Sequence, residues 1–186
     1  MVRSLPRPLL AVVIALPVAL ALAAVVLAIT LGADAERPVP PADDAATPLA
    51  VAAVPAPQAS SPDCARLLGA LPDALRSGPR QLDRRPLADP APAGTAAWGP
   101  TEDPAVLRCG LDRPAELTST ASLLEVNGVR WLHLPDPDLP RATWVAVDRA
   151  VHVALTLSEA TGTGPLQDVS TAIGATLPAR EIRPAG

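Results

Sequence analysis

Five polar side chains on or beside predicted strands are the best candidates for a binding site in this sequence. They are Arg108, His133, Asp148, Arg149 and His152. Polar groups of this kind form a ligand pocket when the strands of a small sheet bring them together. If they do not converge, the same residues belong to a flat surface. The sequence therefore leaves open a site for a small ligand or a reaction, a non-catalytic binding module, and a purely structural spacer. We favour the binding module and expect no enzymatic activity.

The histidines do not predict a metal site. His133 and His152 are the only two in the chain, and no spaced cluster of carboxylates or thiolates accompanies them. Asp136 and Asp138 lie close to His133 in the sequence and would be the only candidate partners for a weak divalent ion. An Asp-Pro-Asp segment more often forms a solvated turn, which is the structure we expect here. No metal is predicted.

Known catalytic and phosphate-binding motifs are absent from the sequence. Gly162 and Gly164 follow a predicted strand and precede a predicted helix, as in phosphate-binding loops, but position 167 is Gln where a third glycine is needed. This segment favours a helix-capping turn. Gly-x-Ser-x-Gly, Ser-x-x-Lys and His-Glu-x-x-His do not occur, so the standard acyl-transfer and metalloprotease sites are excluded. We predict no catalytic residues and no cofactor.

Positive charge is concentrated in one stretch of an otherwise acidic chain. Arg76, Arg80, Arg84 and Arg85 begin a Pro- and Arg-rich segment, residues 76–94, that we expect to be irregular. They could contact an anionic headgroup or a phosphate-bearing wall polymer. A solvated loop is the simpler interpretation, because the chain has no Lys and must use Arg for every basic position.

The two cysteines, Cys64 and Cys109, lie in apolar surroundings on a predicted helix and a predicted strand. Export would place them in an oxidising compartment, which favours a disulfide over the alternative of two buried free thiols. In the chain-entropy model, such a bond would stabilise the fold by roughly 4 kcal/mol.

An uncharged apolar run covers residues 9–31. As a helix it would measure about 34 Å and would cross a bilayer core of roughly 30 Å. Arg3 and Arg7 precede the run, whereas Asp34 and Glu36 follow it, which predicts a cytoplasmic N-terminus and an extracytoplasmic remainder. A cleaved signal peptide is the alternative, but its apolar region is typically about 7–15 residues long. We favour a retained single-pass anchor in the cell membrane.

The sequence divides into three regions. Residues 1–32 form the cytoplasmic tip and the signal anchor, residues 33–62 form an Ala- and Pro-rich tether, and residues 63–186 form an exported domain. Repeated prolines favour an extended tether. The formal net charge of −4 and the absence of Lys argue against nucleic acid as a partner. The bilayer is the predicted partner of residues 9–31, and an envelope protein or a wall polymer is the expected partner of the domain.

Hydrophobic spacing predicts an α+β domain, a small antiparallel sheet with two helices on one face. Ser61 and Pro62 are typical of a helix start, and apolar residues follow at helical spacing on one face: Cys64, Leu67, Leu68, Leu71 and Leu75. Pro72 should end or kink this helix. A second helix starts at Pro165 and ends before Pro178. Four to six strands are expected. The strand candidates are residues 96–98, 105–109, 122–126, 129–134, 143–147 and 151–157, with a hairpin turn at Asn127 and Gly128.

Several short motifs occur in an order that resembles a known family. They are Cys64 followed by LLGALP, then AAWG at residues 96–99, VLRCG at 106–110, VNGVRW at 126–131 and VDR at 147–149. Together they resemble the actinobacterial membrane-anchored proteins called domain of unknown function 3515. The resemblance covers roughly residues 64–178. It implies a single N-terminal span, an exported domain, paired cysteines and no assigned activity.

Overall fold

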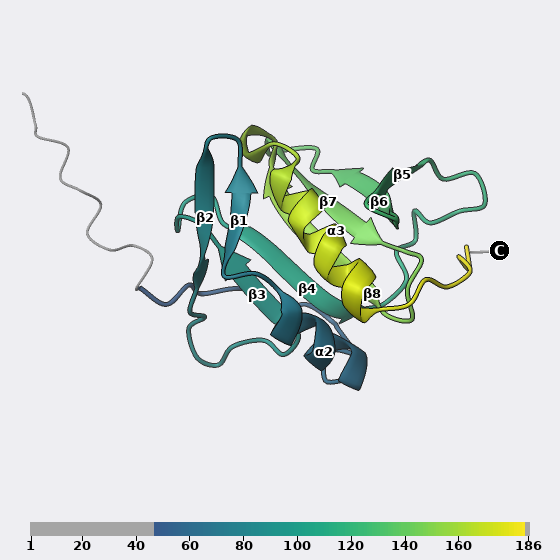
Figure 1. Cartoon of the computed structure of the whole chain (residues 1–186), viewed down its shortest axis with the longest axis horizontal. Coiled ribbons are helices and arrows are strands. Elements are labelled where there is room, and N and C mark those ends of the chain that lie inside the picture. The colour runs from purple at the N-terminus through teal and green to yellow at the C-terminus, as the bar shows by residue number, and fades with distance from the viewer. Residues whose placement is uncertain (1–46, 185–186) are drawn as a thin grey trace, which may run out of the picture. The chain divides into compact units, whose positions relative to one another are not determined.

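The computed structural model describes residues 47–184, in which eight antiparallel strands form one curled sheet that carries two α-helices (Figure 1). The helices are α2 (Pro62–Ala70) and α3 (Gly164–Thr176), and a short 3₁₀ helix covers Glu159–Thr161. The strands are β1 (Ala74–Ser77), β2 (Arg80–Arg85), β3 (Thr95–Trp98), β4 (Ala105–Leu111), β5 (Leu123–Val126), β6 (Val129–Pro135), β7 (Arg141–Ala146) and β8 (His152–Ser158). The predicted α+β class is confirmed for this part of the chain.

The sheet consists of two four-stranded meanders joined side by side. Its strand order is β1-β2-β3-β4-β8-β7-β6-β5, and every neighbouring pair is antiparallel. All six predicted strands are present, but the expected number of four to six is too low. The two additional strands, β1 and β2, form a hairpin inside the segment predicted to be irregular. Most side chains of β2 are exposed or half-buried, so its sequence lacks the apolar alternation by which strands are recognised.

The first helix begins as predicted and ends earlier than its apolar spacing suggests. Ser61 is the N-cap, and its side-chain oxygen accepts a hydrogen bond from the backbone N–H of Cys64 at 3.3 Å. Because proline cannot continue a helix, the chain leaves α2 at Leu71, just before Pro72. Leu75 is therefore not on the helix. It lies in β1, where its side chain is fully buried.

The main core lies between the helices and one face of the sheet. Helix α3 contributes Leu166, Val169 and Ile173 to this core, as its spacing predicts. The indole N–H of Trp131 donates to Ser170 of α3 at 2.9 Å, and that of Trp98 donates to the Pro72 carbonyl at 3.0 Å (both fully buried). Both tryptophans thus satisfy their single polar atom inside an apolar layer. Helix α3 also contacts both edges of the curled sheet, β1 and β5.

Loops and terminal segments cover part of the opposite face. Leu117, from the connection between β4 and β5, packs with Leu132 and Val145, and Ile182 of the C-terminal tail joins the same cluster. Leu49 is buried on this domain and pairs with Leu87 in a parallel bridge. Leu49 therefore packs on the folded domain, although it lies within the segment predicted to be a tether.

Two glycines set the local geometry of the sheet. Asn127 and Gly128 have φ angles of 48° and 73°, as the predicted hairpin turn between β5 and β6 requires. Gly110, with φ of 88°, forms a bulge in β4 that shifts its register against β8. A Cβ at position 110 would lie 2.3 Å from the backbone of Gln58, so only glycine fits this close approach.

The predicted membrane span, residues 9–31, lies outside the described residues, as does the tether up to residue 46. Within residues 47–184, neither helix has the length and apolar character that a bilayer crossing needs.

Candidate functional site

A buried ion pair lies in the turn between β7 and β8. Asp148 and Arg149 are 5% and 7% exposed, and Arg149 Nη1 lies 2.8 Å from Asp148 Oδ2. Arg149 also donates to the backbone carbonyls of Asp148 at 3.0 Å and Gly128 at 2.9 Å. Arg149 Nε and Asp148 Oδ1 are buried without a hydrogen-bond partner among residues 47–184. The pair therefore has hydrogen-bonding capacity that the folded domain does not use.

Arg149 also lines a cavity of about 530 Å³, which falls within the size range of small-ligand pockets. We call it the cationic pocket. Its charged and titratable lining residues are Arg113, Arg149, His152, Arg180, Glu181 and Arg183. The C-terminal tail forms one wall, because the backbone N–H of Arg180 donates to the Asp148 carbonyl at 2.8 Å. Arg113 Nη1 donates to the tail carbonyls of Arg183 and Pro184 at 3.5 and 3.3 Å.

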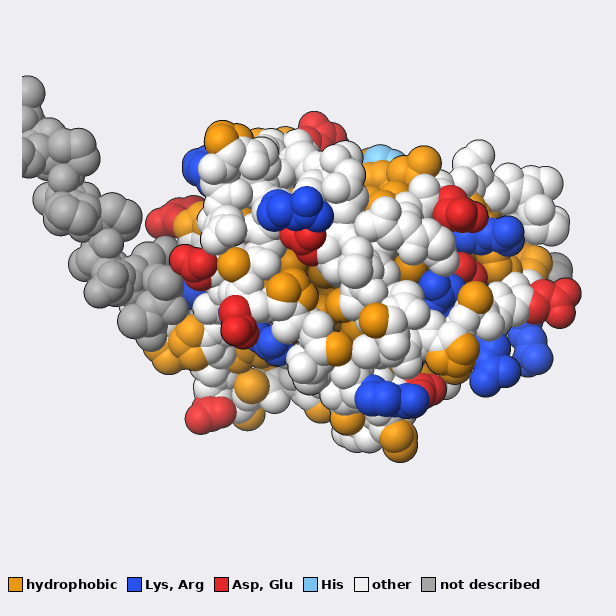
Figure 2. All heavy atoms as spheres, in the orientation of Figure 1, with side chains coloured by type: hydrophobic (Ala, Val, Ile, Leu, Met, Phe, Trp, Pro, Cys, Tyr) orange, Lys and Arg blue, Asp and Glu red, His pale blue; other side chains and the backbone are white. Residues whose placement is uncertain are grey.

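The pocket carries positive charge in a domain whose acidic residues outnumber its basic ones. Four guanidinium groups line it against a single carboxylate, that of Glu181. Figure 2 shows several basic side chains close together, with a few acidic ones among them, at the end of the molecule where Figure 1 places the C-terminal tail. Guanidinium groups bind phosphate and carboxylate groups through paired N–H donors. The arrangement is therefore suited to an anion.

His152 reaches the cationic pocket from the first residue of β8. The bulge at Gly110 pairs Leu111 with His152, and the His152 ring hydrogen-bonds to the Leu111 backbone. Burial lowers the pKa of His152 from its usual value. Burial has the largest effect on this pKa. The positive charge of Arg113 lowers the pKa further, whereas the hydrogen bond with Leu111 and the negative charge of Asp112 raise it. The folded state thus favours the neutral imidazole.

Lowering the pH should destabilise the domain through His152. The pKa of His152 is lower in the folded chain than in the unfolded chain, where it is about 6.5. As the pH falls below about 6.5, the unfolded chain therefore binds more protons than the folded chain. The contribution of neutral His152 to the free energy of unfolding is complete above that pH and is lost as the pH falls through the folded pKa. Urea unfolding between pH 7.5 and 5.5, followed by tryptophan fluorescence, should show this decline in wild-type protein and a shallower one in His152→Gln.

His133→Gln is the matched control, since it removes an exposed imidazole on the opposite face of the sheet. All three tryptophans lie in the described domain, so the fluorescence of the full chain reports on this domain alone. An unchanged pH dependence in His152→Gln would refute the assignment.

The structure brings together only some of the five predicted site residues. Arg149 and His152 line the cationic pocket, and Asp148 lies behind Arg149 as its ion partner. His133 does not meet His152 across the sheet, as the sequence had allowed. Strand pairing aligns His133 with Trp144 on the helix-bearing face, where the two rings stack with centroids 4.1 Å apart.

Arg108 shares the face of His152 but does not line the pocket. It pairs with Ala154 of β8, and its Nη2 donates to the Ala52 carbonyl at 3.3 Å. Burial lowers the pKa of Arg108. This arginine therefore ties the N-terminal segment to the sheet.

The other segments considered from the sequence have structural roles. Asp136 accepts hydrogen bonds from the backbone N–H groups of Asp138 and Leu139, which confirms the predicted turn. Within residues 47–184, no group of three or more His, Cys, Asp or Glu residues is placed to hold a metal ion. Gly164 opens α3 against β1, where a Cβ would lie 2.3 Å from the Arg76 carbonyl oxygen.

The Arg-rich stretch is a folded hairpin with contacts to its neighbours. Arg76 pairs with Asp168 of α3, which raises the pKa of Arg76 through a hydrogen bond and opposite charge. Arg84 donates to carbonyls at the end of α2 and lies over the Trp98 ring. Arg85 is buried and donates to the Gly99 carbonyl at 2.9 Å. The expectation of an irregular loop is wrong, because these arginines hold the hairpin to the rest of the domain.

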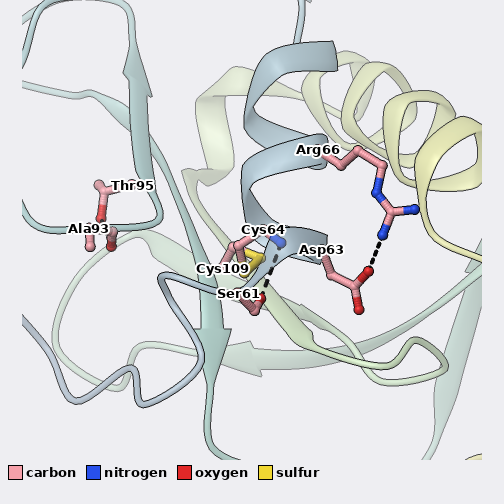
Figure 3. The surroundings of a disulfide bond; sticks show 7 residues. All are labelled: Ser61, Asp63, Cys64, Arg66, Ala93, Thr95 and Cys109. Carbon is pink, nitrogen blue, oxygen red and sulfur yellow. Dashed lines mark hydrogen bonds and ion pairs between the residues drawn. A yellow bond between two sulfur atoms is a disulfide. The ribbon is translucent and has the colours of Figure 1, made fainter.

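A disulfide joins Cys64 of α2 to Cys109 of β4, with 5.6 Å between the Cα atoms (Figure 3). Both residues are fully buried. Arg66 and Asp63 pair on the outer side of the helix, away from the sulfurs. The predicted disulfide is confirmed, and no free cysteine remains in the chain.

Sequence reasoning missed three arginines of the pocket. Arg113 follows β4 in a loop, and Arg180 and Arg183 lie in the tail after α3. No strand or helix periodicity applies to these positions. The one available signal was composition: two arginines among the last seven residues of an acidic domain.

The described residues define an α+β domain with a disulfide between helix and sheet and a cationic pocket at the β7–β8 turn. The family of proteins described as protein of unknown function (DUF3515) matches residues 14–182. Because the match covers most of the chain, the protein belongs to this family. No curated protein matches the sequence, and no solved structure matches it.

Proposed function

We propose that this protein is a membrane-tethered extracytoplasmic module that binds an anionic ligand in the cationic pocket and catalyses no reaction itself. The observation that carries this proposal is the gathering of four arginines and His152 around one cavity. Their side chains come from three separate segments, so the fold and not a local sequence run concentrates the charge. In a cavity of this kind, guanidinium groups attract and orient anions.

A role in binding also agrees with the groups that the domain lacks for catalysis. The disulfide occupies both thiols, so neither cysteine is available as a nucleophile. The two histidines lie on opposite faces of the sheet and cannot act on one substrate. Arg149 and Asp148 neutralise each other in a buried pair, which suits a fixed binding group.

The membrane tether is supported by the sequence at the N-terminal end. The uncharged run at residues 9–31 is long enough to span a bilayer, and the family match includes it from residue 14 onward. A disulfide also suits an extracytoplasmic location. Protease added to intact cells stripped of their wall should therefore digest the domain; a protected domain would refute this part of the proposal.

Binding can be tested with the full chain in a non-ionic detergent and isolated cell envelopes from cells that lack it. We expect the protein to sediment with the envelopes and to be released by salt, because charge interactions are screened. The Arg180→Gln/Arg183→Gln variant should bind several-fold more weakly, since it removes two exposed guanidinium groups of the pocket. Arg80→Gln removes an exposed arginine of β2 and serves as the matched control. Equal binding of all three proteins would refute the pocket as the binding site.

A further inference from the structure

The charge and the donors of the cationic pocket fit one class of anion better than others. We propose that the pocket takes a phosphoryl group with two negative charges, as in a phosphomonoester or inorganic phosphate. This inference rests on the pocket being the binding site proposed above. It adds the chemical class of the ligand.

The charge of the pocket favours an anion. Four guanidinium groups line it against the single carboxylate of Glu181, while Asp148 pairs with Arg149 behind the lining and the charge of Asp112 also reaches His152, so the basic groups still outnumber the acidic ones. A phosphoryl monoester carries about −1.5 to −2 near pH 7, whereas one carboxylate carries −1. A phosphoryl group is therefore attracted more strongly to these arginines than a single carboxylate is.

The separate segments that supply the donors favour a tetrahedral group. Arg113 comes from the loop after β4, Arg149 from the β7–β8 turn, and Arg180 and Arg183 from the tail. The two parallel N–H donors of a single guanidinium satisfy the two oxygens of a planar carboxylate. A phosphoryl group presents three strongly accepting oxygens in different directions, and it can accept from donors on several walls at once.

The exposed arginines of the pocket have donors that the fold leaves available. Arg113 uses Nη1 for both of its bonds to the tail, so its other N–H groups are not needed for that contact. Arg180 and Arg183 are exposed in the tail. Phosphoryl oxygens can accept from these groups, while buried Arg149 contributes to the wall of the pocket.

Glu181 is the one lining residue that opposes an anion. It is exposed, and it lies in the same tail as Arg180 and Arg183. Removing its charge should therefore strengthen binding, whereas removing the arginines should weaken it. A variant that gains affinity cannot be explained by loss of folding.

The experiment is a titration of the full chain in non-ionic detergent micelles, followed by NMR of the histidine rings. The chain has only two histidines, so His152 reports on the pocket and His133 is an internal control on the other face. At pH 7.5 and constant ionic strength, inorganic phosphate should shift the His152 signal saturably and leave His133 unchanged. Succinate, a dicarboxylate, should bind at least about tenfold more weakly. Each of its planar carboxylates pairs with the N–H groups of a single guanidinium and cannot accept from several arginines at once.

Variants assign the effect to the pocket. Arg180→Gln/Arg183→Gln should weaken phosphate binding about tenfold or more, because hydrogen bonds to charged groups are lost. Glu181→Gln should strengthen it about two- to fivefold, the range expected for an exposed charge contact. Arg80→Gln should bind phosphate like the wild type. No gain from Glu181→Gln together with no loss from the arginine variant would overturn the proposal.

The outcomes separate this inference from the proposed function. Binding of succinate as tight as that of phosphate would overturn the phosphoryl class and leave an anion-binding pocket. If neither ion moves the His152 signal, both proposals fail. Glycerol 3-phosphate and a short-chain phosphatidic acid carry the same group on a soluble and on a lipid scaffold. If one of these two compounds binds more tightly, and Arg180→Gln/Arg183→Gln weakens its binding, the phosphoryl class is supported. The tighter compound then shows whether the natural ligand is a soluble molecule or a lipid.

Discussion

Breaking the disulfide between Cys64 and Cys109 is expected to lower the free energy of unfolding by about 4 kcal/mol. The two cysteines are 45 residues apart, and the bond restricts that length of chain in the unfolded state. For a domain of this size, the loss corresponds to a fall in melting temperature on the order of 10 °C. Urea unfolding of the full chain in non-ionic detergent, with and without reductant, measures the difference through tryptophan fluorescence.

The Cys64→Ala/Cys109→Ala variant separates the bond from the reducing conditions. It should resemble the reduced protein, apart from the packing lost with two fully buried sulfurs, and should not respond to reductant. A difference below about 1 kcal/mol between oxidised and reduced wild type would show that the bond adds little. The size of this effect also bears on location, because a domain that depends on its disulfide is less stable in a reducing compartment.

The sequence was most informative where an element is amphipathic and has clear ends. Helix α3 has a proline at its start and another just after its end, and its apolar residues recur at helical spacing, so both its limits and its buried face were predictable. The hairpin of β1 and β2 was missed for the opposite reason. Its strand β2 carries Arg84 and Arg85, which are held by contacts with residues far along the chain, and such contacts leave no periodic pattern in the sequence.

The pocket was predictable only in part, because its parts meet through loops and strand register. Arg149 and His152 were identified from their positions on and beside strands. The face of each histidine depends on which residues of neighbouring strands align, and the bulge at Gly110 changes that alignment. The tail reaches the β7–β8 turn through a backbone contact between Arg180 and Asp148, which leaves no sequence signal.

Replacing Asp148 by Asn should destabilise the domain by about 3–5 kcal/mol, because it removes one partner of a buried ion pair. The side chains of Asp148 and Arg149 are 7% and 3% exposed, so water cannot compensate the remaining guanidinium. Asn still offers one acceptor oxygen to Arg149, which also keeps its contacts with backbone carbonyls, but the buried guanidinium loses its opposite charge. Urea unfolding of the full chain gives the loss, and Glu125→Gln is the control. That substitution breaks an exposed pair with Arg130 at 3.7 Å and should cost under about 1 kcal/mol.

The double variant Asp148→Asn/Arg149→Met distinguishes a structural pair from one retained for binding. If the ion pair stabilises the fold more than an apolar replacement does, the double variant should be clearly less stable than the wild type. We expect it instead to recover a large part of the loss, because an apolar side chain of similar length removes the unpaired charge and its unsatisfied Nε. Recovery of stability together with loss of phosphate binding would mean that the ion pair serves the pocket at the expense of the fold. A double variant as unstable as the single one, with phosphate binding intact, would refute that role for Arg149.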